Sequence, residues 1–385
     1  MKEININNLA QIENASISFG DLTVFVGPQA SGKSILLQLI KLLLDHNSIL
    51  RTIKQHGFDW QQDPEKFASL YFGEGMQNTW DQETKVIIDG KPFNLANTIE
   101  QRGKKRSEEQ LFLIPAQRVI TLKNGWPRAF TDYETGDPYV VKQFSERLRL
   151  LMEAGLGAGK SAIFPQEGRM NKEFRNAVNR GIFSNAEVRL DTSSMRKRII
   201  LRIKNQELPF MVWSAGQREF IPLLLGLYWL MPSAGASKSK NINWVVVEEP
   251  EMGLHPEAIS SLLNVLLELI HRGYKVILST HSPQILELIW AIQILGKYNA
   301  NSDFLLQILN LRKVSYLNKF ADDILTKVFK AYYFERNPRG NISVKDISSL
   351  DAEDLDIAIS DWGGLTHFSS QVSSILSQVI QDSVK

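Results

Sequence analysis

The chain has 385 residues, of which 43% are hydrophobic and 22% charged, and its formal net charge is only +2. This length allows a large buried core, and the near-neutral charge indicates no class of partner. The sequence contains no cysteine, which excludes disulfides and zinc sites with thiolate ligands. The longest apolar run, residues 220–231, is shorter than the roughly 20 residues of a membrane helix, and the polar start lacks the apolar segment of a signal peptide. We therefore expect a cytoplasmic protein without a membrane partner.

The N-terminal part predicts strands followed by a phosphate-binding loop. Residues 3–6 and 14–19 alternate apolar and polar side chains, and residues 23–26 form a short apolar strand. The loop then fits G-x-x-x-x-G-K-[ST], and a leucine-rich helix follows to about residue 44; the candidate nucleotide-binding residues are Gly27, Pro28, Gln29, Ala30, Ser31, Gly32, Lys33, Ser34 and Ile35. Backbone N–H groups of such a loop surround a β-phosphate, the lysine reaches the β and γ oxygens, and the serine ligates Mg²⁺.

A second GKS sequence serves as a comparison. Residues 154–161 read AGLGAGKS, but Ala154 stands where the pattern needs its first glycine, and a helix rather than a strand precedes it. The segment predicts a glycine-rich helix end and not a nucleotide site.

The middle of the chain is basic. Residues 142–198 contain 12 Lys and Arg against 6 Asp and Glu, with two helical patterns. Clustered cations neutralise nucleic-acid phosphates, although a basic face is more often simply solvated, so DNA is a candidate partner. We assign residues 119–189 to a helical, basic insertion, residues 1–118 and 190–340 to the core, and residues 341–385 to a C-terminal strand and helix that complete the core.

Two later strands end in side chains suited to phosphate chemistry. Apolar residues 244–247 precede Glu248 and Glu249, and the strand-like KVILST precedes His281. Ligands of parallel sheets bind at the carboxyl ends of the strands. There, one acid could hold Mg²⁺, the next could polarise the attacking water, and the histidine could reach a γ-phosphate. Each feature alone is compatible with a solvated turn, but together with the phosphate loop they favour a site.

A loop of small residues lies between these motifs in the chain. Ser214, Gly216 and Gln217 belong to SAGQ, directly before an apolar helix. A helix N-terminus can bind an anion, although this short pattern is common and weak by itself.

Together these motifs resemble those of the ABC-type ATPases, in the branch that includes SMC, Rad50, RecF and OLD-like proteins. GPQASGKS resembles the Walker A loop, SAGQ the signature motif, VVVEEPEMGLHP Walker B with the D-loop, and THSP the switch histidine. The EEPE-x-x-LHP, THSP and LIPAQR sequences are most similar to OLD-like ATPases, which are often found in bacterial anti-phage systems. The resemblance covers about residues 1–45 and 195–335. It implies an α/β P-loop NTPase fold with a mixed sheet core, N-terminal antiparallel strands and a helical insertion.

The resemblance also implies a mechanism with ATP and Mg²⁺. Two heads enclose two ATP molecules, so Ser214, Gly216 and Gln217 of one head would contact the nucleotide held by the other. The implied catalytic residues are Glu249 as general base, His281 as γ-phosphate sensor and Lys33. The implied Mg²⁺ residues are Ser34, Glu248 and Gln117, the last as the Q-loop glutamine. Glu248 replaces the usual aspartate, and SAGQ replaces SGGQ; both are compatible with slow turnover.

Three functions remain open. The first is an ATPase, converting ATP and water to ADP and phosphate, whose dimerisation gates a separate nuclease or toxin in anti-phage defence. The second is a RecF-like DNA repair ATPase, and the third is an ATP-dependent scaffold with little turnover. The sequence disfavours a transporter, because it lacks membrane helices, and excludes SMC and Rad50 themselves, because it lacks their long heptad repeats. The acidic residues 351–356 predict a solvated helix start and not a nuclease site.

Overall fold

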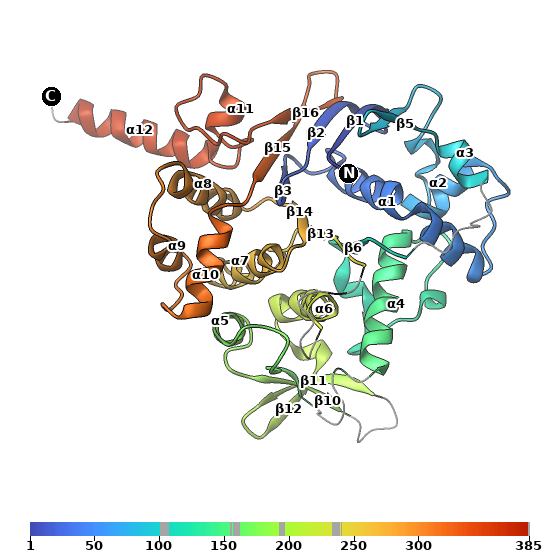
Figure 1. Ribbon diagram of the computed structural model, residues 1–385, viewed down its shortest axis with the longest axis horizontal. Coiled ribbons are helices and arrows are strands. Elements are labelled where there is room, and N and C mark those ends of the chain that lie inside the picture. Colours follow the sequence, from blue (N-terminus) through green and yellow to red (C-terminus); the bar gives the residue numbers. More distant parts are fainter. Residues whose placement is uncertain are drawn as a thin grey trace.

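The computed structural model describes residues 1–100, 108–154, 156, 162–191, 197–232, 239 and 241–383. Its centre is a ten-stranded sheet with the order β5-β4-β1-β2-β16-β15-β3-β14-β13-β6 (Figure 1). The strands of this sheet are β1 (Glu3–Leu9), β2 (Ile12–Ser18), β3 (Leu22–Val26), β4 (Lys85–Ile88), β5 (Lys91–Phe93), β6 (Leu111–Ile114), β13 (Trp244–Glu248), β14 (Lys275–Ser279), β15 (Phe329–Arg336) and β16 (Ile342–Asp346).

The sheet is parallel from β15 to β6 and antiparallel from β5 to β2. Strand β14 pairs in parallel with β3 and β13, β13 pairs in parallel with β6, and β15 pairs in parallel with β3. Strands β5, β4, β1 and β2 form an antiparallel group at the other end. The predicted α/β fold, with a mixed sheet core and N-terminal antiparallel strands, is therefore confirmed.

Helices cover both faces of the large sheet. The helices are α1 (Lys33–Gln55), α2 (Pro64–Phe72), α3 (Leu95–Glu100), α4 (Tyr139–Glu153), α5 (Lys172–Gly181), α6 (Ala215–Leu230), α7 (Pro256–His271), α8 (Pro283–Lys297), α9 (Asp303–Ile308), α10 (Ser315–Ile324), α11 (Ile357–Ser360) and α12 (His367–Ser383). Alternate residues of β13 serve opposite faces: Val246 belongs to the core under α1, and Val245 to the core under α6 and α7. This explains why the strand reads as a continuous apolar run.

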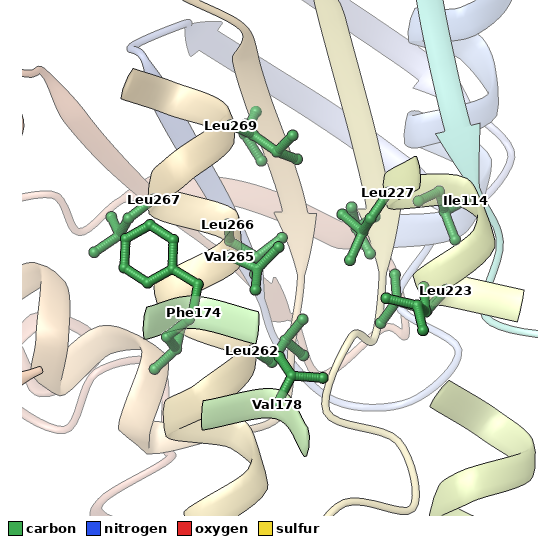
Figure 2. Close-up of a cluster of buried hydrophobic side chains, with 14 of the residues drawn as sticks. Ile114, Phe174, Val178, Leu223, Leu227, Leu262, Val265, Leu266, Leu267 and Leu269 are labelled. Carbon is green, nitrogen blue, oxygen red and sulfur yellow. The ribbon is translucent and has the colours of Figure 1, made fainter. Parts of the chain in front are cut away.

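The core under α6 and α7 also holds part of the middle of the chain. In Figure 2, Leu227 of α6 points toward the sheet near Ile114 of β6. Phe174 and Val178 of α5 lie against α7 beside Leu262. The middle segment is thus attached to the core by a shared hydrophobic cluster and not only by its chain connections.

Residues 119–189 differ from the helical insertion that the sequence predicts. They contain α4 and α5 as predicted, but also the hairpin β7 (Leu122–Lys123) and β8 (Trp126–Pro127). A second, antiparallel sheet of four strands is built from β9 (Ala162–Phe164), β10 (Glu187–Asp191), β11 (Arg198–Ile203) and β12 (Gln206–Pro209). Strands of three to six residues are too short to give a clear alternation, so the long helical patterns dominated the sequence signal.

The C-terminal segment extends the sheet and then leaves it. Strand β16 pairs with β15 and β2, as expected for a strand that completes the core. Helix α12 points away from the body of the molecule (Figure 1). The acidic residues before it cap local turns, since Asp351 accepts from the Glu353 amide and Asp356 from the Ala358 amide. Among the residues that the structure describes, no helix is long and apolar enough to cross a membrane.

Candidate functional site

Four neighbouring parallel strands bring the predicted site residues to one edge of the sheet. In the order β3, β14, β13 and β6, the strands end at Val26, Ser279, Glu248 and Ile114. The phosphate loop, the segment with His281 and the segment with Gln117 follow these ends directly, and the acidic pair consists of the last residue of β13 and the next residue. The spacing of about 4.8 Å between neighbouring strands therefore places residues from four distant parts of the sequence side by side.

The loop after β3 has the backbone that phosphate binding requires. Gly27 and Gly32 have φ values of 145° and 89°, which favour glycine. A Cβ atom at Gly27 would lie 2.9 Å from the Phe334 carbonyl oxygen. Helix α1 begins at Lys33 without a side-chain cap or an acidic residue in its first turn. Its first N–H groups are therefore not used by a side chain and can bind an anion.

The Lys33 ammonium lies inside this loop. Its Nζ donates to the carbonyl oxygens of Gly27 and Pro28, both at 2.8 Å. Burial lowers the pKa of Lys33 to about 8, and the charges of Glu249 and Glu251 oppose this effect. The two carboxylates thus help to keep a cation at the point where the loop would receive phosphate.

The carboxyl group of Glu248 is buried, and one of its two oxygens has no hydrogen-bond partner among the described residues. Its Oε2 accepts from the Ala116 amide at 2.9 Å, whereas its Oε1 is buried and has no hydrogen-bond partner among the described residues. Burial raises the pKa of Glu248 to about 7, while the Ala116 amide and the Ser34 hydroxyl oppose the rise. A buried, unsatisfied carboxylate oxygen is costly unless a ligand completes it.

Glu249 and His281 form a pair beside it. The Glu249 Oε1 lies 3.6 Å from the His281 Nε2. The backbone amide of Glu249 donates to the Ser279 carbonyl at 2.9 Å. The nearby His281 side chain lowers the pKa of Glu249. Glu249 is half-buried and has a φ of 43°, in the left-handed region that few non-glycine residues adopt. A lowered pKa suits a base that must be ionised at neutral pH.

The signature loop begins α6 and contacts the D-loop. Ser214 is exposed and forms a capping box with Gln217, because each side chain bonds to the backbone amide of the other. A Cβ atom at Gly216 would lie 2.6 Å from the Gly253 carbonyl oxygen. Only glycine therefore allows this approach between the two loops.

Gln117 lies at the expected edge of the sheet, but it is the next residue, Arg118, that bonds to the acidic turn. Gln117 is exposed at the start of a 3₁₀ turn. Arg118 is completely buried and donates to the Glu219, Glu248 and Glu249 carbonyl oxygens at 3.1, 3.0 and 3.1 Å. Arg118 belongs to LIPAQR but was not predicted as a functional residue. A basic residue at the end of an apolar strand was the available signal.

Glu251 was missed as well. Its Oε1 accepts from the Thr280 hydroxyl and from the His281 amide, both at 2.7 Å. It therefore joins the turn after β13 to the segment that carries His281. The repeated acids of EEPE were visible in the sequence, but the first two were sufficient for the expected chemistry, so the third received no assignment.

Comparison with known proteins agrees with this geometry. The family described as "AAA ATPase domain" matches residues 1–123, and the family described as "AAA domain, putative AbiEii toxin, Type IV TA system" matches residues 127–287. The Old nuclease of Escherichia phage P2 is 47% identical over 72 residues, which are 18% of this chain and 12% of that protein. The chain is thus similar to OLD-like ABC-type ATPases.

The chain is also similar to solved structures, at low sequence identity. The SMC head bound to the C-terminal winged-helix domain of ScpA has 10% identity and a TM-score of 0.42, with 90% of this chain and 96% of that chain covered. The SMC head of Thermotoga maritima has 13% identity and a TM-score of 0.34, with 90% and 98% covered. A dimeric bacterial ABC transporter cassette has 14% identity and a TM-score of 0.32, with 73% and 89% covered.

ATPases of this type use Mg²⁺, and the residues present fit this ion. The unsatisfied Oε1 of Glu248 and the Ser34 hydroxyl are both hard oxygen ligands, which Mg²⁺ prefers. Mg²⁺ retains several waters, so one or two protein oxygens are sufficient. The longer Glu248 side chain in place of aspartate is accommodated by the bond from the Ala116 amide, which holds its other oxygen.

Proposed function

We propose that this OLD-like ATPase binds ATP and Mg²⁺ between two copies of the chain, hydrolyses the ATP, and thereby gates a separate effector, a nuclease or toxin, in anti-phage defence. The observation that carries the proposal is the convergence of Lys33, Glu248 and the Glu249–His281 pair at one sheet edge. A phosphate-binding cation, an acid with a free oxygen and an ionised base are the groups that hydrolysis of a terminal phosphoryl requires.

Each residue has a separate task in this proposal. The N–H groups at the start of α1 and the Lys33 ammonium bind the phosphates. Glu249 orients the attacking water and accepts its proton, and His281 holds the Glu249 carboxylate in place from 3.6 Å. Ser34 and Glu248, with Gln117 as the third candidate, would hold Mg²⁺, which neutralises charge on the β and γ phosphates when bound.

Dimerisation is supported by the position of the signature loop. Ser214 and Ala215 are exposed, and Gly216 packs against Gly253 of the D-loop at the same surface. The N-terminus of a 16-residue helix carries a partial positive charge that favours a phosphate. An exposed helix start of this kind can bind the γ-phosphate of a nucleotide held by a second copy.

The effector part rests on the relatives. The matching phage P2 protein is named a nuclease, and the description of one matching family names a toxin. Because the match covers 12% of the phage protein, its activity supports only the class of effector. DNA contact by the basic segment stays a proposal.

The dimer is tested with Glu249→Gln. This change keeps the shape of the side chain but removes the base, so turnover should fall by about 100-fold or more while ATP binding persists. The variant should therefore sediment as a dimer with ATP and Mg²⁺ and as a monomer without them. Glu257→Gln, at an exposed position of α7, is the matched control and should behave as wild type. A variant that stays monomeric at saturating ATP contradicts the proposal, and negligible turnover by the wild type favours the scaffold function.

The defence role is tested in cells that carry the natural gene cluster. Lys33→Ala should remove protection, so that phages plate equally well with and without the cluster. Equal protection by the wild type and Lys33→Ala would show that ATP binding does not serve defence.

A further inference from the structure

The Arg118 side chain lies between the acidic turn after β13 and the first turns of α6. It is 0% exposed, and all three of its guanidinium nitrogens donate to backbone carbonyls. Nη1 bonds to the Glu248 oxygen at 3.0 Å, and Nη2 bonds to the Glu249 oxygen at 3.1 Å. On the other side, Nε bonds to the Glu219 oxygen in α6 at 3.1 Å.

These bonds hold the two peptide planes that flank the Cα atom of Glu249. The Glu248 carbonyl belongs to the plane before this atom, and the Glu249 carbonyl belongs to the plane after it. A non-glycine residue at a φ of 43° is strained, so the turn needs such support. The planar, rigid fork of an arginine can fix several acceptors at once, which a lysine cannot.

Arg118 also joins this turn to the helix that carries the signature loop. Its acceptor in α6, Glu219, comes five residues after Ser214. The Glu219 side chain lies against Gly253 of the D-loop, since a Cβ atom at Gly253 would be 3.2 Å from its Cγ. Arg118 therefore links Glu249, the base of one nucleotide site, to the helix of the signature loop, which would contact the nucleotide held by a second copy.

We propose that Arg118 is a positioning residue that fixes the backbone on both sides of Glu249 and ties this turn to the start of α6. The proposal rests on the function proposed above, in which Glu249 is the base. Arg118 does not touch the nucleotide in this scheme. Its loss should therefore lower kcat and leave the affinity for ATP nearly unchanged.

The experiment compares Arg118→Lys with Arg169→Lys. Arg169 is a matched control, because it is also buried and also donates to backbone carbonyls, those of Tyr228 at 2.9 Å and Leu156 at 3.1 Å. Its acceptor Tyr228 lies near the C-terminal end of α6, away from the acidic turn. Both changes remove buried hydrogen bonds, so both should lower the melting temperature.

Only Arg118→Lys should affect catalysis at a temperature where both variants are folded. We expect its kcat to fall by about 10- to 100-fold with a KM within about threefold of wild type, and Arg169→Lys to keep at least half of the wild-type kcat. Equal losses of kcat in the two variants, or a loss of ATP affinity that accounts for the loss in Arg118→Lys, would overturn the proposal. Should Arg118→Lys not fold, Arg118→Gln retains donors without the buried charge, and the same two outcomes decide.

The failure of this inference can be separated from the failure of the proposed function. A wild-type protein without ATP turnover contradicts the function itself. A wild-type protein with turnover that needs Glu249, combined with an Arg118→Lys variant that behaves like Arg169→Lys, leaves the function intact and removes only the role of Arg118.

Discussion

The carboxyl edge of the large sheet and the basic middle segment (residues 142–198) are both rich in charged side chains, but these side chains have different partners. In the middle segment, Arg149 pairs with Glu146 and Glu153, and Arg198 pairs with Asp191. Lys142 is 2% exposed, and its Nζ donates to backbone carbonyls. Most of the described cations in this segment thus serve the fold.

At the sheet edge, by contrast, buried carboxylate oxygens of the described residues are left without partners. Glu248 Oε1 and Glu251 Oε2 are buried and unsatisfied among the described residues. Such atoms destabilise the protein by itself and are retained where a ligand completes them. A count of charges therefore does not indicate a binding site, whereas buried carboxylate oxygens without partners, at the ends of parallel strands, do.

The largest expected effect separates the two GKS sequences. Lys33→Ala removes the ammonium from the loop at the sheet edge and should lower ATP turnover by about 100-fold or more. Lys160→Ala, in the second GKS sequence, should leave turnover within about twofold of wild type. Steady-state phosphate release measures both variants. An equal loss in both would show that the segment after α4 also binds nucleotide, which the sequence argues against.

The next effect concerns the free energy of unfolding of the metal-free protein. The pKa of Glu248 is raised by burial from 4.5 to about 7, so between these values the folded protein keeps a proton that the unfolded chain has lost. Raising the pH through this window therefore lowers the stability of the wild type, by about 3 kcal/mol in total. Glu248→Gln abolishes this titration.

Denaturant unfolding at several pH values, with a chelator present, tests this. The stability of Glu248→Gln relative to wild type should increase by about 3 kcal/mol from pH 4.5 to pH 8, while its Mg²⁺-dependent ATP turnover is lost. A stability difference that does not change with pH would contradict a buried, raised-pKa carboxyl at this position.

A smaller effect is expected at the contact between the signature loop and the D-loop. Gly216→Ala would place a methyl group 2.6 Å from the Gly253 carbonyl oxygen, a backbone atom that cannot easily move. We expect a stability loss of about 1–3 kcal/mol and a weaker ATP-dependent dimer. Gly226→Ala in the same helix is the control. Its methyl group would meet only side-chain atoms of Ile114 and Phe144 at 3.0 Å, so its loss, measured by thermal unfolding, should be smaller.

The smallest effect is expected for DNA. Because most described cations of the middle segment bond to carboxylates or backbone carbonyls of the protein, the affinity for duplex DNA should be weak and should change little across a salt series. The exposed Lys172→Ala and Arg180→Ala changes should leave ATP turnover within about twofold of wild type. A slope of log affinity against log salt concentration that corresponds to six or more phosphate contacts would show instead that this segment is a DNA-binding surface.

Much of the site could be predicted because its signals are local. The glycines at positions 27 and 32 encode the backbone of the loop, and buried apolar runs before Glu248 and His281 mark the ends of parallel strands. The same locality limits the prediction. The short strands β9 to β12 carry little periodic signal, and they pair with partners that no single window of the sequence contains.

The sequence by itself therefore determined the fold class and the residues that meet at the sheet edge, since glycine conformation and strand burial depend on neighbouring residues in the chain. Only the tertiary structure decided that Arg118 supports the turn of Glu249 from 131 residues away, and that Lys142 of the basic segment donates to backbone carbonyls. The physical reason is that hydrogen bonds and ion pairs depend on which groups folding brings within about 3 Å, and this is a property of the whole chain.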